Sequence, residues 1–217
     1  MNMKNSIQKI YQDHHLNNRP QNFSILEKER GDLLKKYIGK GKKIIDIGCR
    51  DGTLTKHFID DNDILGVDID IKALHEAEMN FGIKTIHMDL NGDWNELGDK
   101  KFDVVVAGEV LEHSYYPEKI LKSILRHMNS EGIFIGSVPN AFSLKNRIRY
   151  LFGSKKWTPL SDPTHINQFS YGELNSVLKK QFNDVKIIGL GRYRKLSKIF
   201  PSLFAFDLFW ISKNKKE

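Results

Sequence analysis

Residues that can bind a polar ligand recur at the ends of four successive apolar runs. Gly48, Asp68, Asp89 and the pair Gly108-Glu109 each stand where such a run stops. A glycine lets the backbone approach a ligand closely, and a carboxylate can accept hydrogen bonds from two neighbouring hydroxyls at once. The recurrence predicts one binding site assembled from several segments, and it is a stronger signal than any one position.

A second group of reactive side chains begins at Glu109. Glu109, Glu112 and His113 are spaced i, i+3 and i+4, so in a helix all three would lie on one face. Together with His165 they form a candidate site for a divalent cation, although Mg²⁺ prefers carboxylates and water to imidazole, and we expect no stable metal. His113 is alternatively a general base, because the pKa of histidine lies near neutrality, with Glu112 orienting it and His165 as the second choice of base. A third interpretation is that His113 only caps its turn.

The loop that must position these groups lies at residues 43–54. We expect a strand, a glycine turn and then a helix, from the β-branched run, the two glycines and the periodic apolar residues Leu54, Phe58 and Ile59. A dinucleotide-binding fingerprint would be G-x-G-x-x-G. Here Gly48 and Gly52 give only G-x-x-x-G, which disfavours a nicotinamide-dependent reductase.

Strand-like and helix-like segments alternate along the chain. We expect strands near 43–47, 64–67, 83–88, 102–107 and 132–138, and two closing strands at 185–190 and 205–211 joined by a basic loop, 192–198. Helices are expected at 24–39, after Asp70, from Pro117 and from Ser170; Ser24 and Ser170 are each followed three residues later by a glutamate, as in a capping box. Apolar strands between helices are typical of an α/β fold with a parallel sheet covered on both faces, where ligands bind beyond the carboxyl ends of the strands.

Composition limits the kind of protein. The 217 residues suit one domain, 1–217, with a polar N-terminal arm at 1–21 and an aromatic, basic insertion at 139–168 that we interpret as a lid over the site. The net charge is +7, and from residue 140 onward 15 lysines and arginines stand against 5 acidic residues. That asymmetry fits either a solvated basic face or an acceptor that carries phosphate or carboxylate.

The chain shows no sign of membrane insertion or secretion. No apolar run approaches the roughly 20 residues of a membrane span, and the polar N-terminus lacks the core of a signal peptide. The single cysteine, Cys49, cannot form an internal disulfide, and we expect it to pack as a small residue rather than to act as a nucleophile. We therefore expect a cytoplasmic protein.

At this point the sequence resembles a known family. Asp46-Ile-Gly-Cys-Arg-Asp-Gly is similar to the first motif of class I S-adenosylmethionine-dependent methyltransferases, and Gly108-Glu-Val-Leu-Glu-His113 resembles a later motif of their small-molecule branch. The resemblance implies a Rossmann-like, seven-stranded, mostly parallel sheet with an antiparallel last strand, and S-adenosylmethionine as cofactor. It implies that Asp68 binds the ribose hydroxyls and that Asp89 lies at the adenine. The full set of expected cofactor-binding residues is Asp46, Gly48, Cys49, Arg50, Gly52, Asp68, Ile69, Asp89, Leu90, Gly108 and Glu109.

The resemblance says less about the acceptor. It is nearest to methyltransferases of surface-polysaccharide and glycolipid biosynthesis, so we expect a small acceptor whose oxygen is methylated. One alternative is a metal-assisted RNA 2′-O-methyltransferase, because Glu109, Glu112, His113 and His165 resemble the metal site of small-RNA methyltransferases; the absence of a recognisable RNA-binding module counts against it. Another is a non-catalytic, cofactor-binding partner protein. The oligomeric state stays open.

Overall fold

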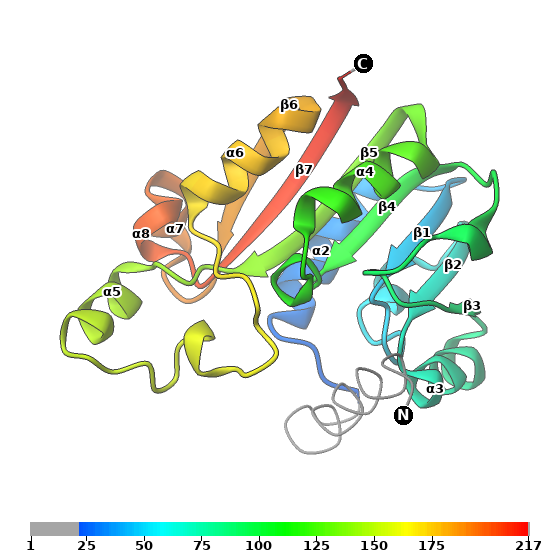
Figure 1. The fold of residues 1–217 in the computed structure, drawn as a ribbon. Helices are drawn as coiled ribbons and strands as arrows, with labels where there is room; N and C mark the ends of the chain where they lie inside the picture. Colours follow the sequence, from blue (N-terminus) through cyan, green and yellow to red (C-terminus); the bar gives the residue numbers. More distant parts are fainter. Residues whose placement is uncertain (1–21, 217) are drawn as a thin grey trace.

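The computed structural model describes residues 22–216, so the predicted arm at 1–21 lies outside the described residues. One seven-stranded sheet organises this part of the chain, with the strand order β3-β2-β1-β4-β5-β7-β6 (Figure 1). The strands are β1 (Lys43–Ile47), β2 (Asp63–Asp68), β3 (Lys84–His87), β4 (Phe102–Gly108), β5 (Met128–Pro139), β6 (Phe182–Leu190) and β7 (Asp207–Lys215). β1 to β5 pair in parallel, whereas β7 is antiparallel to both β5 and β6. The predicted Rossmann-like fold is confirmed, including its antiparallel last strand.

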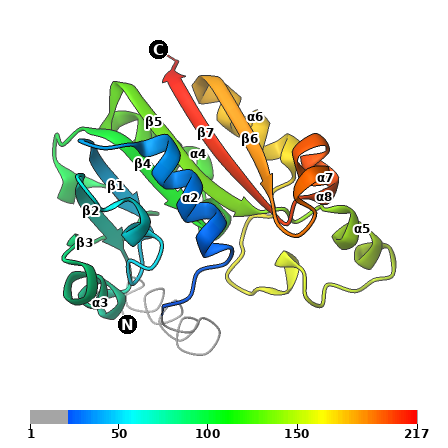
Figure 2. The same ribbon diagram turned by 180° about the vertical axis from the view of Figure 1, so that it is seen from behind.

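Helices cover both faces of the sheet. α4 (Pro117–His127) and α6 (Tyr171–Gln181) lie on the face turned to the viewer in Figure 1, and α2 (Glu27–Ile38) crosses the opposite face, seen in Figure 2. α3 (Ile71–Phe81) follows β2, α5 (Leu144–Leu151) projects at one end, and α7 (Arg194–Ile199) and α8 (Pro201–Phe204) precede β7. The described residues also form four short 3-10 helices: η1 (Thr55–Phe58), η2 (Asn95–Leu97), η3 (Leu111–His113) and η4 (Pro159–Ser161).

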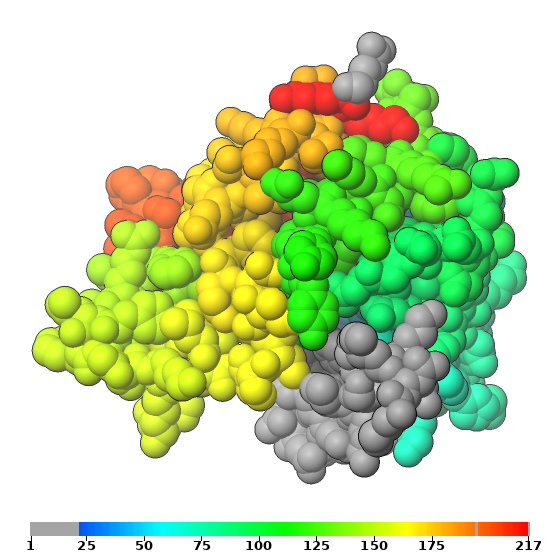
Figure 3. Space-filling model, in the orientation of Figure 1, coloured from blue at the N-terminus to red at the C-terminus, as the bar shows by residue number. Residues whose placement is uncertain are grey.

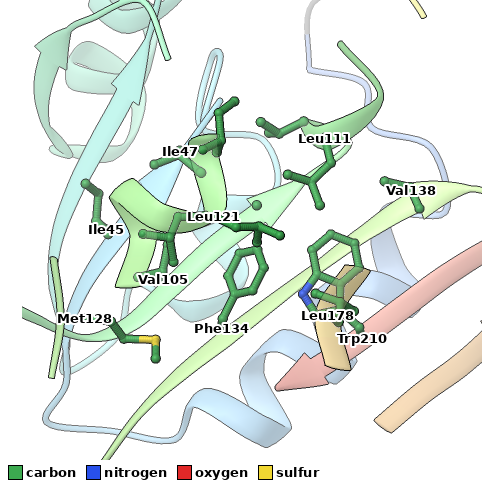
Figure 4. Close-up of a cluster of buried hydrophobic side chains, with 14 of the residues drawn as sticks. Ile45, Ile47, Val105, Leu111, Leu121, Met128, Phe134, Val138, Leu178 and Trp210 are labelled. Atoms are coloured by element: carbon green, nitrogen blue, oxygen red, sulfur yellow. The ribbon is translucent and has the colours of Figure 1, made fainter. Parts of the chain in front are cut away.

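Two apolar cores lie on the two faces of the sheet. Alternate residues of a strand point to opposite faces, so Ile45 and Ile47 join one core while Ile44 joins the other. Figure 4 shows the first core, where Leu121 of α4 and Leu178 of α6 pack against side chains of the sheet such as Trp210 of β7. Packing in the two cores holds the strands in position. The ends of the strands then determine where the residues that follow them lie.

Three local predictions were wrong. The glycine loop is followed by the single 3-10 turn η1 rather than by an α-helix. α2 begins at Glu27 with Leu26 as its N-cap residue, because Ser24 accepts a hydrogen bond from Arg30 and the Glu27 carboxylate lies against Lys56 and His57 instead of capping the helix. The expected basic loop at 192–198 is largely helical, as α7.

Other local predictions are confirmed. The Ser170 hydroxyl and the Glu173 carboxylate form the predicted capping box of α6. Pro117 opens α4, and Asp70 caps α3 by accepting hydrogen bonds from the backbone N–H groups of Lys72 and Ala73. No helix among residues 22–216 is long and apolar enough to cross a membrane.

Candidate active site

A cavity of about 650 Å³ opens at the carboxyl ends of β1, β2 and β4. The strand order reverses between β1 and β4, which is where ligands bind in sheets of this kind. Gly48, Asp68, Asp89 and Glu109 all line the cavity, so the structure brings together the strand-end residues singled out in the sequence. Its far wall comes from the 139–168 segment, including Trp157.

The glycine loop lies tightly between β1 and η3. Gly48 has a φ of +71°, and a Cβ atom there would stand 2.6 Å from Cγ2 of Val110. Gly52, at φ +76°, is required for a different reason: its Cβ would meet Ile83 and Phe81. Of the two glycines, Gly48 borders the cavity, and Gly52 packs toward α3 and β3 instead.

Cys49 is buried within this loop. Its sulfur lies in the space that a side chain at position 66 would need, which is why β2 carries Gly66 there. Burial is the largest cause of a thiol pKa raised well above its usual value, and the Asp68 carboxylate adds to it. The thiol therefore stays protonated, which fits a packing role and not a nucleophile.

Asp46 is a buried carboxyl at the base of the cavity. Its Oδ2 accepts a hydrogen bond of 2.7 Å from the Thr55 hydroxyl. Burial raises the pKa of Asp46 to about 7, against the opposing effects of that hydrogen bond and of Arg30. Near neutral pH this group can therefore exchange a proton when the charge inside the cavity changes.

Asp68 is held in place by the backbone. Oδ2 accepts from the N–H of Arg50 and Oδ1 from the N–H of Asp70, both at 2.9 Å. Arg50 has a φ of +50°, so the loop adopts an unusual backbone conformation to make the first of these bonds. A carboxylate oxygen accepts more than one hydrogen bond, so the fixed carboxylate can also accept hydroxyls of a ligand.

Asp89 opens a turn at the other end of the cavity. Its Oδ1 accepts a hydrogen bond of 2.9 Å from the N–H of Asn91, and its backbone carbonyl accepts one from Gly92. Ile69 and Leu90 also line the cavity, so apolar side chains and the Asp89 carboxylate both belong to its wall. Apolar and carboxylate groups together can bind an uncharged ring with a polar edge.

Sequence reasoning missed two charged residues on the cavity wall, Arg30 and Asp207. Arg30 is 2% exposed and its Nε lies 3.9 Å from Oδ2 of Asp207, which is 1% exposed. Burial, reinforced by nearby Glu109, raises the pKa of Asp207 well above its usual range. Glu109 has a φ of +60° and accepts a hydrogen bond from the Ser137 hydroxyl. A signal existed: Arg30 precedes Leu34 and Ile38 at four-residue spacing on the buried stripe of α2.

The two histidines expected near the reaction point lie together. The rings of His113 and His165 meet edge to face with centroids 4.8 Å apart, and both line the cavity. Nδ1 of His113 is 2.9 Å from the carbonyl oxygen of Thr164, which can only accept, so Nδ1 carries the hydrogen. In the neutral ring the basic lone pair therefore lies on Nε2.

Glu112 lies beside His113 and His165, and it is not among the described residues that line the cavity. It is 2% exposed, and its Oε1 lies 3.9 Å from Nε2 of His113. The ligand atoms of Glu112, His113 and His165 all lie within 4.8 Å of one another, which is a candidate metal cluster. Glu109, expected as a fourth member, lies outside the cluster among residues 22–216, because it precedes η3 (Leu111–His113) and is not in one helix with Glu112 and His113.

Aromatic residues of the 139–168 segment and of the turn after His113 differ in their relation to the cavity. Trp157 lines the cavity. Tyr150 instead donates a hydrogen bond to the carbonyl of Ala141 and meets Phe142 edge to face, which anchors the 139–168 segment. Tyr115 and Tyr116 are exposed, and neither belongs to the cavity wall in the part of the chain that the structure describes.

Comparison with known proteins identifies the kind of fold. A family model described as a methyltransferase domain matches residues 17–184. The ribosomal protein L11 methyltransferase of Aquifex aeolicus is 31% identical over 105 residues, which cover 48% of this chain and 42% of that protein. The chain thus spans less than half the length of this curated relative.

Two solved structures share the whole architecture. A possible histamine N-methyltransferase from Thermotoga maritima superimposes with a TM-score of 0.67 at 17% identity, covering 98% of this chain and 97% of that one. The plantazolicin methyltransferase BpumL, solved in complex with S-adenosylhomocysteine, gives 0.62 at 19% identity, covering 96% and 90%. At these identities the likeness shows a common fold.

Proposed function

The chain belongs to the methyltransferase domain family and is a class I S-adenosylmethionine-dependent methyltransferase, and we propose that it methylates an oxygen of a sugar- or phosphate-bearing small molecule. When bound, S-adenosylmethionine supplies a methyl group on a positively charged sulfur and leaves as S-adenosylhomocysteine. The residues of the chain have to hold the cofactor, exclude water and accept the proton of the acceptor.

The cavity wall offers a partner for each part of the cofactor. Asp68 would accept the two ribose hydroxyls, since backbone N–H groups already fix its carboxylate. Ile69, Leu90 and Asp89 would receive the adenine ring and its amine. Gly48 would allow the loop backbone to approach the cofactor closely.

The buried charges would bind the amino-acid end. A guanidinium binds a carboxylate with two parallel hydrogen bonds, and Arg30 borders the cavity at its buried base. The cofactor's ammonium would lie against the acidic residues nearby, Asp46, Glu109 and Asp207. An arrangement of this kind matches the mixed charges of an amino acid, which a nicotinamide cofactor lacks.

His113 would act as the general base, and one observation carries this assignment. The hydrogen bond from Nδ1 to Thr164 leaves Nε2 as the basic atom of a histidine that lines the cavity. As the acceptor oxygen attacks the methyl group, the proton of its hydroxyl would move to Nε2 of His113. Nδ1 would keep its own hydrogen and continue to donate it to the Thr164 carbonyl. Glu112, 3.9 Å from Nε2, would stabilise the positively charged ring that results. His165 is the second candidate for this role.

The acceptor would enter under the 139–168 segment. Trp157 and Lys145 of this segment line the cavity, and they combine a flat apolar surface with a positive charge. Sugars bind well to aromatic faces, and phosphates or carboxylates bind to lysine. We propose that the segment serves as a lid within a single domain, and that the enzyme belongs to the branch acting on surface polysaccharides or glycolipids.

An acceptor screen with methyl-labelled cofactor tests this proposal. Sugars, sugar phosphates and nucleotide sugars are incubated with the wild-type chain and with His113→Asn, and the linkage in the product is established by mass spectrometry and NMR. We expect an O-methyl ether whose formation depends on His113. Transfer only to nitrogen or carbon, or equal rates for the two proteins, would contradict the assignment.

A second candidate function is a metal-assisted RNA 2′-O-methyltransferase. The cluster of Glu112, His113 and His165 favours it, because two imidazoles and a carboxylate within 4.8 Å can bind a divalent ion. In that case His113 would be a ligand and not a base. Metal analysis of the purified chain, and methylation of RNA ends with and without chelator, distinguish the two candidates.

A further inference from the structure

The outer end of the molecule carries an unusual helix. In α5 the apolar residues Leu144, Ile148 and Leu151, with Phe152 directly after the helix, follow the i, i+4, i+7, i+8 spacing of an apolar stripe. In a helix packed onto a protein this stripe faces the core. Here the four side chains are 39%, 50%, 82% and 80% exposed, and the buried residue of the helix is the polar Asn146.

Positive charges frame the exposed stripe. At 3.6 residues per turn, Lys145 and Arg147 flank it on its two sides, and both are exposed. Beyond the helix, Trp157 is 72% exposed, with the Lys156 ammonium 4.5 Å and the Arg149 guanidinium 5.4 Å from its ring centre. Apolar side chains surrounded by lysine, arginine and tryptophan are typical of helices that lie in the headgroup layer of a membrane.

A second exposed stripe adjoins the first. α8 packs against both α5 and α7, and α7 with the residue after it exposes Leu196, Ile199 and Phe200 at 43%, 67% and 54%. Figure 3 shows α5 projecting from the body with the orange residues of α7 and α8 beside it. We call the exposed side chains of 144–157 and 195–200 the α5–α7 surface.

The charge of this surface decides what it can bind. Residues 144–157 and 195–200 contain seven lysines and arginines and no aspartate or glutamate. A second copy of the chain would present the same positive charge and be repelled. RNA would suit the charge, and its bases could stack on the exposed aromatic rings, but it would leave the exposed leucine and isoleucine side chains without an apolar partner. An anionic lipid bilayer satisfies both the charge and the aliphatic side chains.

We propose that the α5–α7 surface docks this enzyme on an anionic membrane surface. The stripe of α5 enters the boundary between headgroups and acyl chains while the lysines and arginines bind the acidic headgroups. Lys145 and Trp157 belong both to this surface and to the cavity wall, so docking would bring the cavity mouth to the level of the headgroups. The proposal depends on the exposed side chains and not on the proposed acceptor, so vesicle binding and methyl transfer can fail independently.

Vesicle flotation tests the proposal with the full chain. Vesicles of phosphatidylcholine alone and of phosphatidylcholine with 30% phosphatidylglycerol (both about 100 nm in diameter) are compared at low and high salt. We expect binding to the anionic vesicles that weakens with salt. Neutralising any one lysine or arginine of the α5–α7 surface should reduce the vesicle partition coefficient about fivefold. The double variant Leu151→Ser/Phe152→Ser should reduce this coefficient at least tenfold.

A matched control distinguishes binding through the α5–α7 surface from nonspecific binding through any exposed apolar side chain. Met79→Ser removes a side chain that is 72% exposed on α3, outside the α5–α7 surface, and should leave vesicle binding unchanged. Unfolding temperature and S-adenosylhomocysteine affinity show that each variant is folded. The proposal is overturned if anionic vesicles do not bind the wild-type chain at low salt, or if Met79→Ser loses as much binding as the double variant. Binding of single-stranded RNA but not of vesicles through the same residues would also overturn it.

Discussion

Replacing Asp68 with alanine tests the cofactor site most sharply. In the proposed complex this carboxylate accepts two ribose hydroxyls, and each hydrogen bond to a charged group contributes about 1.5–3 kcal/mol. Loss of both should weaken cofactor binding by about 3–6 kcal/mol, which is about two to four powers of ten in Kd. The variant also removes the acceptor of the Arg50 and Asp70 N–H groups, so its stability must be measured as well.

Calorimetric titration with S-adenosylhomocysteine measures the change in Kd, and thermal unfolding measures the loss of stability in the variant. Asp63→Ala is the matched control, because Asp63 begins the same strand at its opposite end and its side chain forms an exposed ion pair with Lys84. The control should bind the ligand as the wild type does. A folded Asp68→Ala variant with Kd within twofold of the wild type would refute the ribose assignment.

Three further predictions concern proton transfer to His113, the positive charge of Arg30 and the buried carboxyl of Asp46. His113→Asn should lower turnover about a hundredfold or more with little change in cofactor affinity, whereas His75→Asn, an exposed histidine on α3, should leave turnover unchanged. Arg30→Met should weaken binding of S-adenosylhomocysteine about tenfold or more, but not binding of adenosine, which lacks the carboxylate; equal losses for both ligands would contradict the assignment. Because burial raises the pKa of Asp46 to about 7, the folded state holds a proton that the unfolded state has lost, so the free energy of unfolding should fall by about 2 kcal/mol between pH 5 and pH 7 from this group. Urea unfolding of the Asp46→Asn variant at pH 5 and pH 7 should show that this part of the pH dependence of the unfolding free energy is lost.

The sequence was sufficient where local pattern and topology agree. Alternating strands and helices imply a parallel sheet, and the carboxyl ends of parallel strands share one edge. The sequence alone therefore places Asp68, Asp89 and Glu109 at one edge of the sheet. Ser170 and Glu173 form their capping box, and no other group among residues 22–216 bonds to either side chain.

The failures come from tertiary contacts that spacing does not encode. Ser24 and Glu27 have the same spacing as Ser170 and Glu173, but Arg30, Lys56 and His57 engage them instead. Arg30 and Asp207 lie 177 residues apart in the chain and meet only because β7 inserts between β5 and β6. The i, i+3, i+4 spacing placed Glu109 with Glu112 and His113, but the chain turns at Glu109 with a positive φ and sends its side chain toward Ser137.

A crystal structure with S-adenosylhomocysteine tests the central claim most directly, through the distance from each Asp68 carboxylate oxygen to the ribose hydroxyls. The account predicts both hydroxyls within about 2.6–3.2 Å of the carboxylate, with the sulfur on the side of the cavity that His113 and His165 line. A ribose bound elsewhere in the cavity, or a sulfur facing away from both histidines, would contradict it.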